Sequence, residues 1–320
     1  MVYSKTNIKA VKDGLFLWFN NVIPSLLPFF IATELLKFTN IPYIIGKKLN
    51  NLMRPLFNVP GIGAYAFTMG IISGYPVGAK IVADFREKNL CTQEEAERLI
   101  TFTNNSGPLF ILGTVGISLF SNISIGILLL VTHILASLTV GIIFRFWKSS
   151  HMKRNSNNET LNFIVDYNNL GEILANSITN SINTIVLIGG FITLFSVIIS
   201  ILNNSPLNRL IIFTFSPLFN FLNIDKKFII PLISGMIELT SGLNLTSLVP
   251  FKFLGVNVIV CSFLLGFGGI SVMLQVASII YKSHISIKSY ILGKFLHGII
   301  AAFYTYIVIS MFPYFNYFLF

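Results

Sequence analysis

Long stretches without charged residues are the feature that most constrains the fold of this chain. A helix that crosses a bilayer needs about 20 mainly apolar residues. Only 11% of all residues are charged, whereas a soluble domain has about 25%. We therefore predict an all-α, multi-pass integral membrane protein of the cell membrane, in contact with the lipid bilayer. The stretches that contain no Lys, Arg, Asp or Glu are 14–33, 55–79, 99–144, 173–208, 253–281 and 295–320.

Short breaks rich in Gly, Pro and small polar residues interrupt these apolar stretches. Two breaks lie at 73–76 (SGYP) and 104–108 (NNSGP), and two more lie around 234–235 (SG) and at 266–269 (GFGG). Unwound backbone is tolerated in a membrane only where it is buried in protein or lines a cavity. Transporters build substrate sites near the midplane from such discontinuous helices. We therefore predict broken or re-entrant helices that meet at one central site.

The two halves of the chain also resemble each other. The tripeptide ISG at 72–74 recurs at 233–235, and ISI at 123–125 recurs at 285–287, with offsets of 161 and 162 positions. Collinear matches at a nearly constant offset favour an internal duplication, which is a common build of secondary transporters. We prefer an inverted topology for the two halves. The predicted parts are a first gate-like repeat at 14–147, a basic hinge loop at 148–170 and a second repeat at 171–312.

Polar side chains and glycines at the breaks make up the candidate substrate site. Backbone N–H groups at the start of a half-helix favour anions, and glycine lets the backbone approach a ligand closely. Lys80, one turn beyond Pro76, offers a cation for an acidic substrate, or is a lysine that snorkels to the membrane face. The candidate substrate-binding residues are Ser73, Gly74, Tyr75, Lys80, Asn104, Asn105, Ser106, Gly107, Ser234, Gly235, Gly268, Gly269, Ser271 and Gln275.

Two acidic residues lie within or beside apolar segments. An acid at membrane depth is expensive and usually functional, so Glu238 is a candidate for binding a coupling proton or Na⁺. The alternative is that its carboxylate caps the hydroxyls of Thr240 and Ser241. Glu34 is either an acid at the membrane interface or a group of the site, and we favour the interface because Lys37 lies one turn away.

The charged stretch at 84–98, between the first two breaks, predicts a solvated loop. Within it, Thr92 followed by Glu94 and Glu95 is typical of a helix start with a capping residue and acids in the first turn. The stretch at 41–59 mixes basic and apolar residues and predicts an amphipathic helix at the membrane surface.

Enzymatic and nucleic-acid-binding functions find little support. There is no Gly-rich phosphate loop, no Cys–His metal spacing and no Ser-His-acid pattern. The four histidines, at 133, 151, 284 and 297, lie in unrelated settings; His133 is either a functional group or a partner in an interhelical hydrogen bond. The net charge of +10 comes from basic residues scattered between apolar runs, as the positive-inside bias predicts. We expect no catalytic site, metal, cofactor or nucleic-acid partner, and the oligomeric state stays open.

Four motifs resemble those of a known family. They are SGYPVGAK at 73–80, EEAERLITFTNNSGPLFILGTVG at 94–116, SGMIELTSG at 234–242 and LLGFGGISVMLQV at 264–276. Together they resemble the YlbJ family of sporulation integral membrane proteins, part of the wider group that carries the gate, or nucleoside-recognition, domain. The resemblance implies a role in endospore formation, in the mother-cell-derived outer forespore membrane. It also implies a link to the passage of dipicolinate toward the forespore.

The sequence thus predicts a carrier of a small anionic solute, with dipicolinate as the substrate that the resemblance implies. Gate-domain relatives include nucleoside-type carriers, so a nucleoside or purine transporter is the first alternative. The second is a non-transporting membrane scaffold for assembly of the spore cortex or envelope. A carrier requires polar residues that face one cavity, whereas a scaffold would bury the breaks in dry packing.

Overall fold

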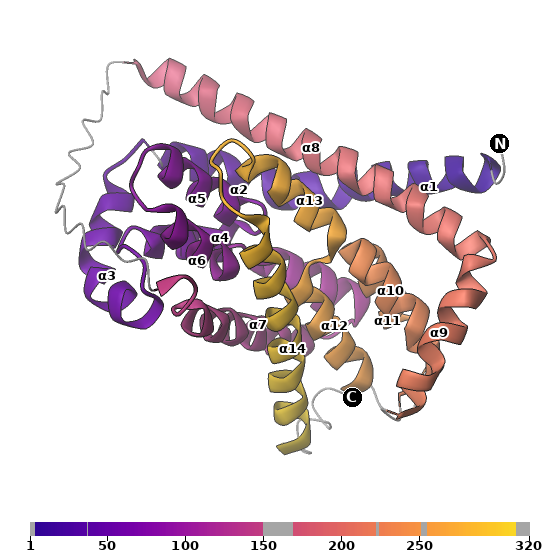
Figure 1. The fold of residues 1–320 in the computed structure, drawn as a ribbon. Helices are drawn as coiled ribbons and strands as arrows, with labels where there is room; N and C mark the ends of the chain where they lie inside the picture. The colour runs from indigo at the N-terminus through magenta and orange to yellow at the C-terminus, as the bar shows by residue number, and fades with distance from the viewer. Residues whose placement is uncertain (1–3, 37, 150–168, 222–223, 251–254, 312–320) are drawn as a thin grey trace.

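The computed structural model describes residues 4–36, 38–149, 169–221, 224–250 and 255–311, and their regular structure is helical throughout (Figure 1). The all-α prediction is therefore confirmed. Four helical segments are long and apolar enough to cross a membrane: Ile123–Phe144, Leu170–Asn204, Gly255–Ile280 and Ile287–Met311. Shorter apolar helical segments lie at Leu26–Leu36, Gly63–Ser73 and Leu109–Leu119. These lengths are those of a multi-pass integral membrane protein.

The first half of the chain alternates between complete and interrupted helices. Thr92 caps α6 as predicted, and a capping box forms there: its side chain accepts from the Glu95 backbone N–H, and the Glu95 side chain accepts from the Thr92 N–H. In order, the elements are α1 (Ser4–Leu17), the π-helical turn η1 (Trp18–Val22), α2 (Ile23–Leu36), α3 (Ile41–Phe57), α4 (Gly63–Ser73), α5 (Val77–Glu87), α6 (Gln93–Thr103), the π-helical η2 (Leu109–Leu119) and α7 (Ile123–Phe144).

The second half begins with the longest helix. The basic hinge predicted at 148–170 falls largely on 150–168, outside the described residues. The elements that follow are α8 (Leu170–Asn204), α9 (Leu207–Phe221), the 3₁₀ turn η5 (Lys226–Phe228), α10 (Ile229–Ile237), α11 (Leu239–Ser247), α12 (Gly255–Phe267), α13 (Gly269–Ile280) and α14 (Ile287–Met311).

The two halves interlock through their helices. In Figure 1, α8 runs along the upper side of the molecule with α1 beside it, and it packs against both α1 and α2. α14 packs against α12 of its own half and against α6 and α7 of the first half. Of the short helices beside the breaks, α13 packs against α8, whereas α6, η2 and α12 pack against α7 (Figure 1).

Three of the predicted breaks lie where the sequence places them, and the fourth is displaced. Helices end at Ser73, Thr103 and Phe267, at the three predicted positions. The prediction of a break at 234–235 is wrong, because α10 continues to Ile237 and the interruption falls at Glu238. Gly235 instead permits close packing: a Cβ there would lie 2.5 Å from the Leu264 side chain.

The charged stretch between the first two breaks is not a solvated loop. α5 and α6 occupy most of it, and several of its charges are buried. Glu97 is fully buried; it accepts a 2.8 Å hydrogen bond from Trp147 Nε1 and forms a 2.8 Å ion pair with Lys148. Glu95 pairs with Arg54. Composition predicted exposure here, but these ion pairs and hydrogen bonds allow the carboxylates to be buried.

Candidate functional site

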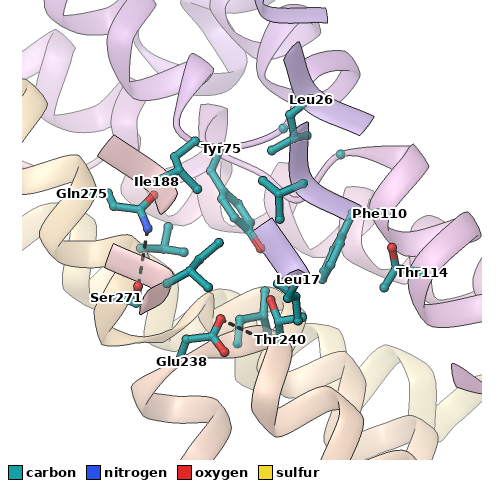
Figure 2. A pocket seen from close by; sticks show the side chains of 16 residues that line it. Leu17, Leu26, Tyr75, Phe110, Thr114, Ile188, Glu238, Thr240, Ser271 and Gln275 are labelled. Atoms are coloured by element: carbon teal, nitrogen blue, oxygen red, sulfur yellow. Dashed lines mark hydrogen bonds between the residues drawn. The ribbon is translucent and has the colours of Figure 1, made fainter. Parts of the chain in front are cut away.

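The four interrupted helices meet around one cavity, shown in Figure 2. It has about 60 Å³ of space for the centres of water molecules. Its walls are completed by apolar side chains from α1, η1, α2 and α8, among them Leu17, Leu26 and Ile188 (Figure 2). Three breaks contribute to the lining directly: Gly74 and Tyr75 from the first, Gly107 from the second and Glu238 from the third. The fourth is represented by Ser271 and Gln275 of α13, the helix that follows it.

The breaks approach one another in pairs, backbone against backbone. Gly74 has φ +80°, and a Cβ there would lie 3.0 Å from the Gly107 nitrogen. Gly269 has φ +82°, and a Cβ there would lie 3.0 Å from the Gly235 carbonyl oxygen. These values of φ are strained for any residue with a side chain. Glycine is therefore required at both positions for the broken helices to meet.

Glu238 is the N-cap of α11. Its two carboxylate oxygens accept hydrogen bonds from the backbone N–H groups of Thr240 and Ser241, at 2.9 and 2.8 Å. The alternative of capping is thus realised through backbone N–H groups rather than through the two hydroxyls. The side chain is buried and borders the cavity (Figure 2). A carboxylate at a helix N-terminus is stabilised by the helix dipole, so α11 offsets its charge.

Ser271 and Gln275 form the polar wall contributed by α13. Gln275 Nε2 donates to Ser271 Oγ at 3.4 Å, while Gln275 Oε1 has no hydrogen-bond partner among the described residues although the side chain is buried (Figure 2). An unpartnered buried polar atom is uncommon and costly. One end of this amide is therefore available to a ligand.

Several predicted site residues are engaged elsewhere. Ser73 Oγ shares a 2.7 Å hydrogen bond with Thr33 Oγ1. Lys80 Nζ forms a 2.9 Å ion pair with Glu34 and donates to Thr184 Oγ1 at 3.2 Å. Glu34 is buried within the protein, and its place at the membrane interface stays a prediction. The ammonium group of Lys80, rather than water, neutralises this carboxylate.

The polar residues of the second break mainly hold the break in place. Asn104 Nδ2 donates to the Tyr290 hydroxyl at 2.7 Å, and Asn105 Nδ2 donates to the Phe102 carbonyl at 2.8 Å. Ser106 Oγ contacts a backbone carbonyl of α12. All three are buried. The predicted residues that do not line the cavity are Ser73, Lys80, Asn104, Asn105, Ser106, Ser234, Gly235, Gly268 and Gly269.

A buried basic cluster beside the second break was missed by sequence reasoning. Lys294 Nζ lies 3.4 Å from His297 Nδ1 and donates to the Asn104 carbonyl at 3.3 Å. The rings of His133 and His297 lie with their centroids 4.4 Å apart. The expectation that the histidines lie in unrelated settings is therefore wrong for this pair. The available signal was a lysine and a histidine three residues apart within an apolar helix.

One comparison finds a close relative. The sporulation integral membrane protein YlbJ of Bacillus subtilis (strain 168) is 39% identical to this chain over 318 residues. The match covers 94% of this chain and 77% of the relative. No protein-family model matches the chain, and no solved structure matches it. The level of identity and its extent place both chains in one family.

Proposed function

The chain belongs to the YlbJ family of sporulation integral membrane proteins, and from this premise we propose that it is a membrane carrier used in sporulation. Its cargo is a small anionic solute, with dipicolinate as the first candidate, which it moves toward the forespore. The family relationship supports the sporulation role, because the relative's name states it. The transport role rests on the cavity.

The observation that carries the proposal is that residues of three breaks and of α13, the helix that follows the fourth, line one cavity. Glu238, Ser271 and Gln275 supply polar groups from the second half, and Gly74 and Tyr75 bring the first half to the same space. Unwound backbone at a cavity inside a helical bundle is the build of a transporter site. A non-transporting scaffold has no need of polar groups that face a common cavity.

An aromatic anion fits the chemistry of this lining. Tyr75 and Phe110 border the cavity and offer faces for a flat ring. The N-terminus of α13 reaches the same cavity at Ser271, and backbone N–H groups at helix starts favour carboxylates. The negative charge of Glu238 is offset by the hydrogen bonds that its carboxylate accepts from the backbone N–H groups of Thr240 and Ser241.

A nucleoside or purine base is the second candidate, favoured by one specific observation. The unpartnered Gln275 Oε1 can accept a hydrogen bond from an N–H group on the edge of an uncharged base. The scaffold for cortex or envelope assembly is the third candidate. It differs from both carriers because it needs no solute at the cavity.

The fold also supports an internal duplication, which we include in the proposal. The order α4, break, α5, α6, break, η2, α7 recurs as α10, break, α11, α12, break, α13, α14. The cavity lies between the broken helices of the two repeats. Alternating access would move the two repeats relative to each other around this cavity.

Uptake into proteoliposomes tests the proposal. Terbium trapped inside the vesicles reports the arrival of dipicolinate by its luminescence. Wild-type protein should produce a signal that grows with time. Gln275→Leu should reduce the initial rate roughly tenfold, the equivalent of one lost hydrogen bond, here the bond that the second hydrogen of Gln275 Nε2, not used by Ser271, would donate to a carboxylate. Ser278→Ala, on the exposed side of α13, is the matched control and should transport normally.

The outcomes separate the candidates. If wild-type vesicles show no terbium luminescence but accumulate labelled nucleoside, the second candidate replaces dipicolinate as the proposed substrate. Vesicles that take up neither solute, from protein shown to be folded by its thermal transition, would contradict transport and leave the scaffold.

A further inference from the structure

The basic cluster of Lys294, His297 and His133 has no role in the cavity lining described above. Its three side chains are at most 1% exposed. They come from α14 and α7, one helix from each half of the chain. Both helices are candidate membrane spans. Ionisable groups inside a membrane bundle are expensive and are usually retained for ion or proton pathways.

The hydrogen bonds assign the protons on both rings. His297 Nε2 lies 3.0 Å from the His133 carbonyl oxygen, which can only accept, so this nitrogen carries a hydrogen. In the neutral ring, Nδ1 is then a lone-pair nitrogen that accepts from Lys294. His133 Nε2 accepts from the Ser106 backbone N–H at 3.2 Å. Its hydrogen is therefore on Nδ1, which has no partner among the described residues.

No carboxylate in the described parts of the chain pairs with Lys294. Helix α14 packs against α6, α7, α12 and α13. On these helices, His133 of α7 is the titratable side chain that contacts His297. Tyr290 of α14 is linked to Lys294 through Asn104, which bonds to both. The charged residues of α6 lie in its first half, α13 has no titratable residue and α12 has Cys261 alone. Burying an ammonium without a counter-ion is costly, so this lysine is not explained by packing.

The surroundings of the cluster leave no room for a solute. None of its three residues lines the cavity. Around it, the helices touch at backbone distance: a Cβ at Gly293 would lie 2.7 Å from the Thr101 side chain, and one at Gly298 would lie 2.9 Å from the Phe263 carbonyl. A proton is the ligand that fits such packing.

The cluster is also joined to the substrate cavity through the second break. Lys294 donates to the carbonyl of Asn104, and Ser106 donates to His133. The next residue, Gly107, lines the cavity and touches Gly74. Two of the cluster's hydrogen bonds thus hold the segment that shapes the cavity.

We propose that Lys294, His297 and His133 form the proton-binding site that couples proton movement to solute transport. In the step itself, an N–H bond of the Lys294 ammonium breaks and leaves its electron pair on Nζ. The proton forms a new N–H bond with the lone pair of His297 Nδ1, so the lysine becomes neutral and the ring becomes an imidazolium. Water on one side of the membrane supplies this proton, and water on the other side receives it.

The coupling acts through Asn104. A hydrogen bond from a charged ammonium to a carbonyl is roughly twice as strong as one from a neutral amine. Loss of the proton from Lys294 therefore loosens the second break, whereas its return tightens the break. Glu238, the acid at the cavity, has both oxygens held by α11 and is not needed for this step.

The inference rests on the proposed transport function, and its test separates the two. Vesicles containing the full chain are given a gradient of one pH unit at zero membrane potential, which supports about tenfold accumulation per coupled proton. Wild-type protein should accumulate dipicolinate accordingly. Lys294→Met and His297→Gln should lose the response to the gradient but keep exchange of dipicolinate between equal concentrations. Lys288→Met, an exposed lysine on the same helix, should respond as wild type does.

Full gradient-driven accumulation in Lys294→Met would overturn the proposal. Absence of any dipicolinate transport by wild type would instead overturn the proposed substrate. In that case ¹⁵N-histidine NMR still tests the cluster, in a His151→Gln, His284→Gln background that leaves the two rings of interest. We expect both ring signals to change in one shared pH transition that Lys294→Met shifts or abolishes. Ring titrations that are the same with and without Lys294 would refute proton sharing.

Discussion

Gly74 and Gly107 lie so close that a Cβ on Gly74 would be 3.0 Å from the Gly107 nitrogen. The two residues belong to different breaks, and both line the central cavity. Gly74 also has φ +80° and ψ 179°, a region that is essentially limited to glycine. The meeting of the first two broken helices therefore depends on the missing side chain.

Replacing Gly74 should destabilise the protein and narrow the cavity. We expect Gly74→Ala to lower the free energy of unfolding by about 2 kcal/mol, from backbone strain of 1–3 kcal/mol at such a residue. Denaturant unfolding in detergent measures this loss. The control is Gly190→Ala in α8, where an added Cβ meets nothing within 4 Å and should be neutral or slightly stabilising. Equal stability of the two variants would contradict the proposed constraint.

Removing the cap of α11 should weaken the cavity wall as well as the helix. Glu238→Ala leaves the N–H groups of Thr240 and Ser241 without their acceptors, and loss of a cap costs about 0.5–2 kcal/mol. Asp225→Ala is the control, because Asp225 is an exposed cap that accepts from Lys227 N–H and does not line the cavity. We expect both variants to be less stable by thermal unfolding, but only Glu238→Ala to transport more slowly. Unchanged transport in Glu238→Ala would remove this residue from the site.

The sequence predicts features that are local. Clusters of Gly, Pro and small polar residues inside an apolar run interrupt a helix locally, so the breaks at 73–76, 104–108 and 266–269 could be located. The capping box at Thr92 is local in the same sense. The break at Glu238 could not be located, because Gly235 within α10 resembles a stop signal in the sequence. Its real use is packing against Leu264, which is distant in sequence.

The partners of polar residues could not be predicted, because they lie far apart along the chain. Lys80 is an anion-binding candidate from sequence alone, but the fold places it beside Glu34. His133 and His297 are separated by 164 positions, and only the crossing of α7 and α14 brings their rings together. Burial of Glu97 likewise requires Trp147 and Lys148.

The ion pair between Lys80 and Glu34 allows a structural role of Lys80 to be separated from a role in substrate binding. We expect Lys80→Met to destabilise the protein by about 3 kcal/mol, because it removes the ammonium that neutralises a buried carboxylate. The double variant Glu34→Gln, Lys80→Met should regain most of that loss, as replacement of both partners of a buried pair commonly does. A double-mutant cycle of unfolding free energies measures the coupling. If the double variant is stable but does not take up dipicolinate, Lys80 acts on the substrate and the purely structural role is refuted.

Cys91 should be a poorly reactive thiol, despite its place in the turn between α5 and α6, outside the candidate spans. Burial raises the pKa of its thiol to about 12, and the charge of Glu95 adds to this effect. The thiolate is the reactive form. At pH 8 a cysteine with the ordinary pKa of about 8.5 is roughly one quarter thiolate, whereas a pKa of about 12 leaves about one part in ten thousand.

The expected rate of maleimide labelling at Cys91 is therefore lower than that of an exposed cysteine by about three orders of magnitude. Its rate should keep rising with pH through pH 10, because the thiolate fraction grows tenfold per unit below the pKa. Lys88→Cys, in a Cys91→Ala background, provides the exposed reference in the same turn, and its rate should level off above about pH 9. Mass spectrometry of the labelled protein, with Cys261 replaced by Ala, measures both rates. Comparable rates at pH 8 would show that Cys91 is reached by water and that the α5–α6 turn is open rather than packed.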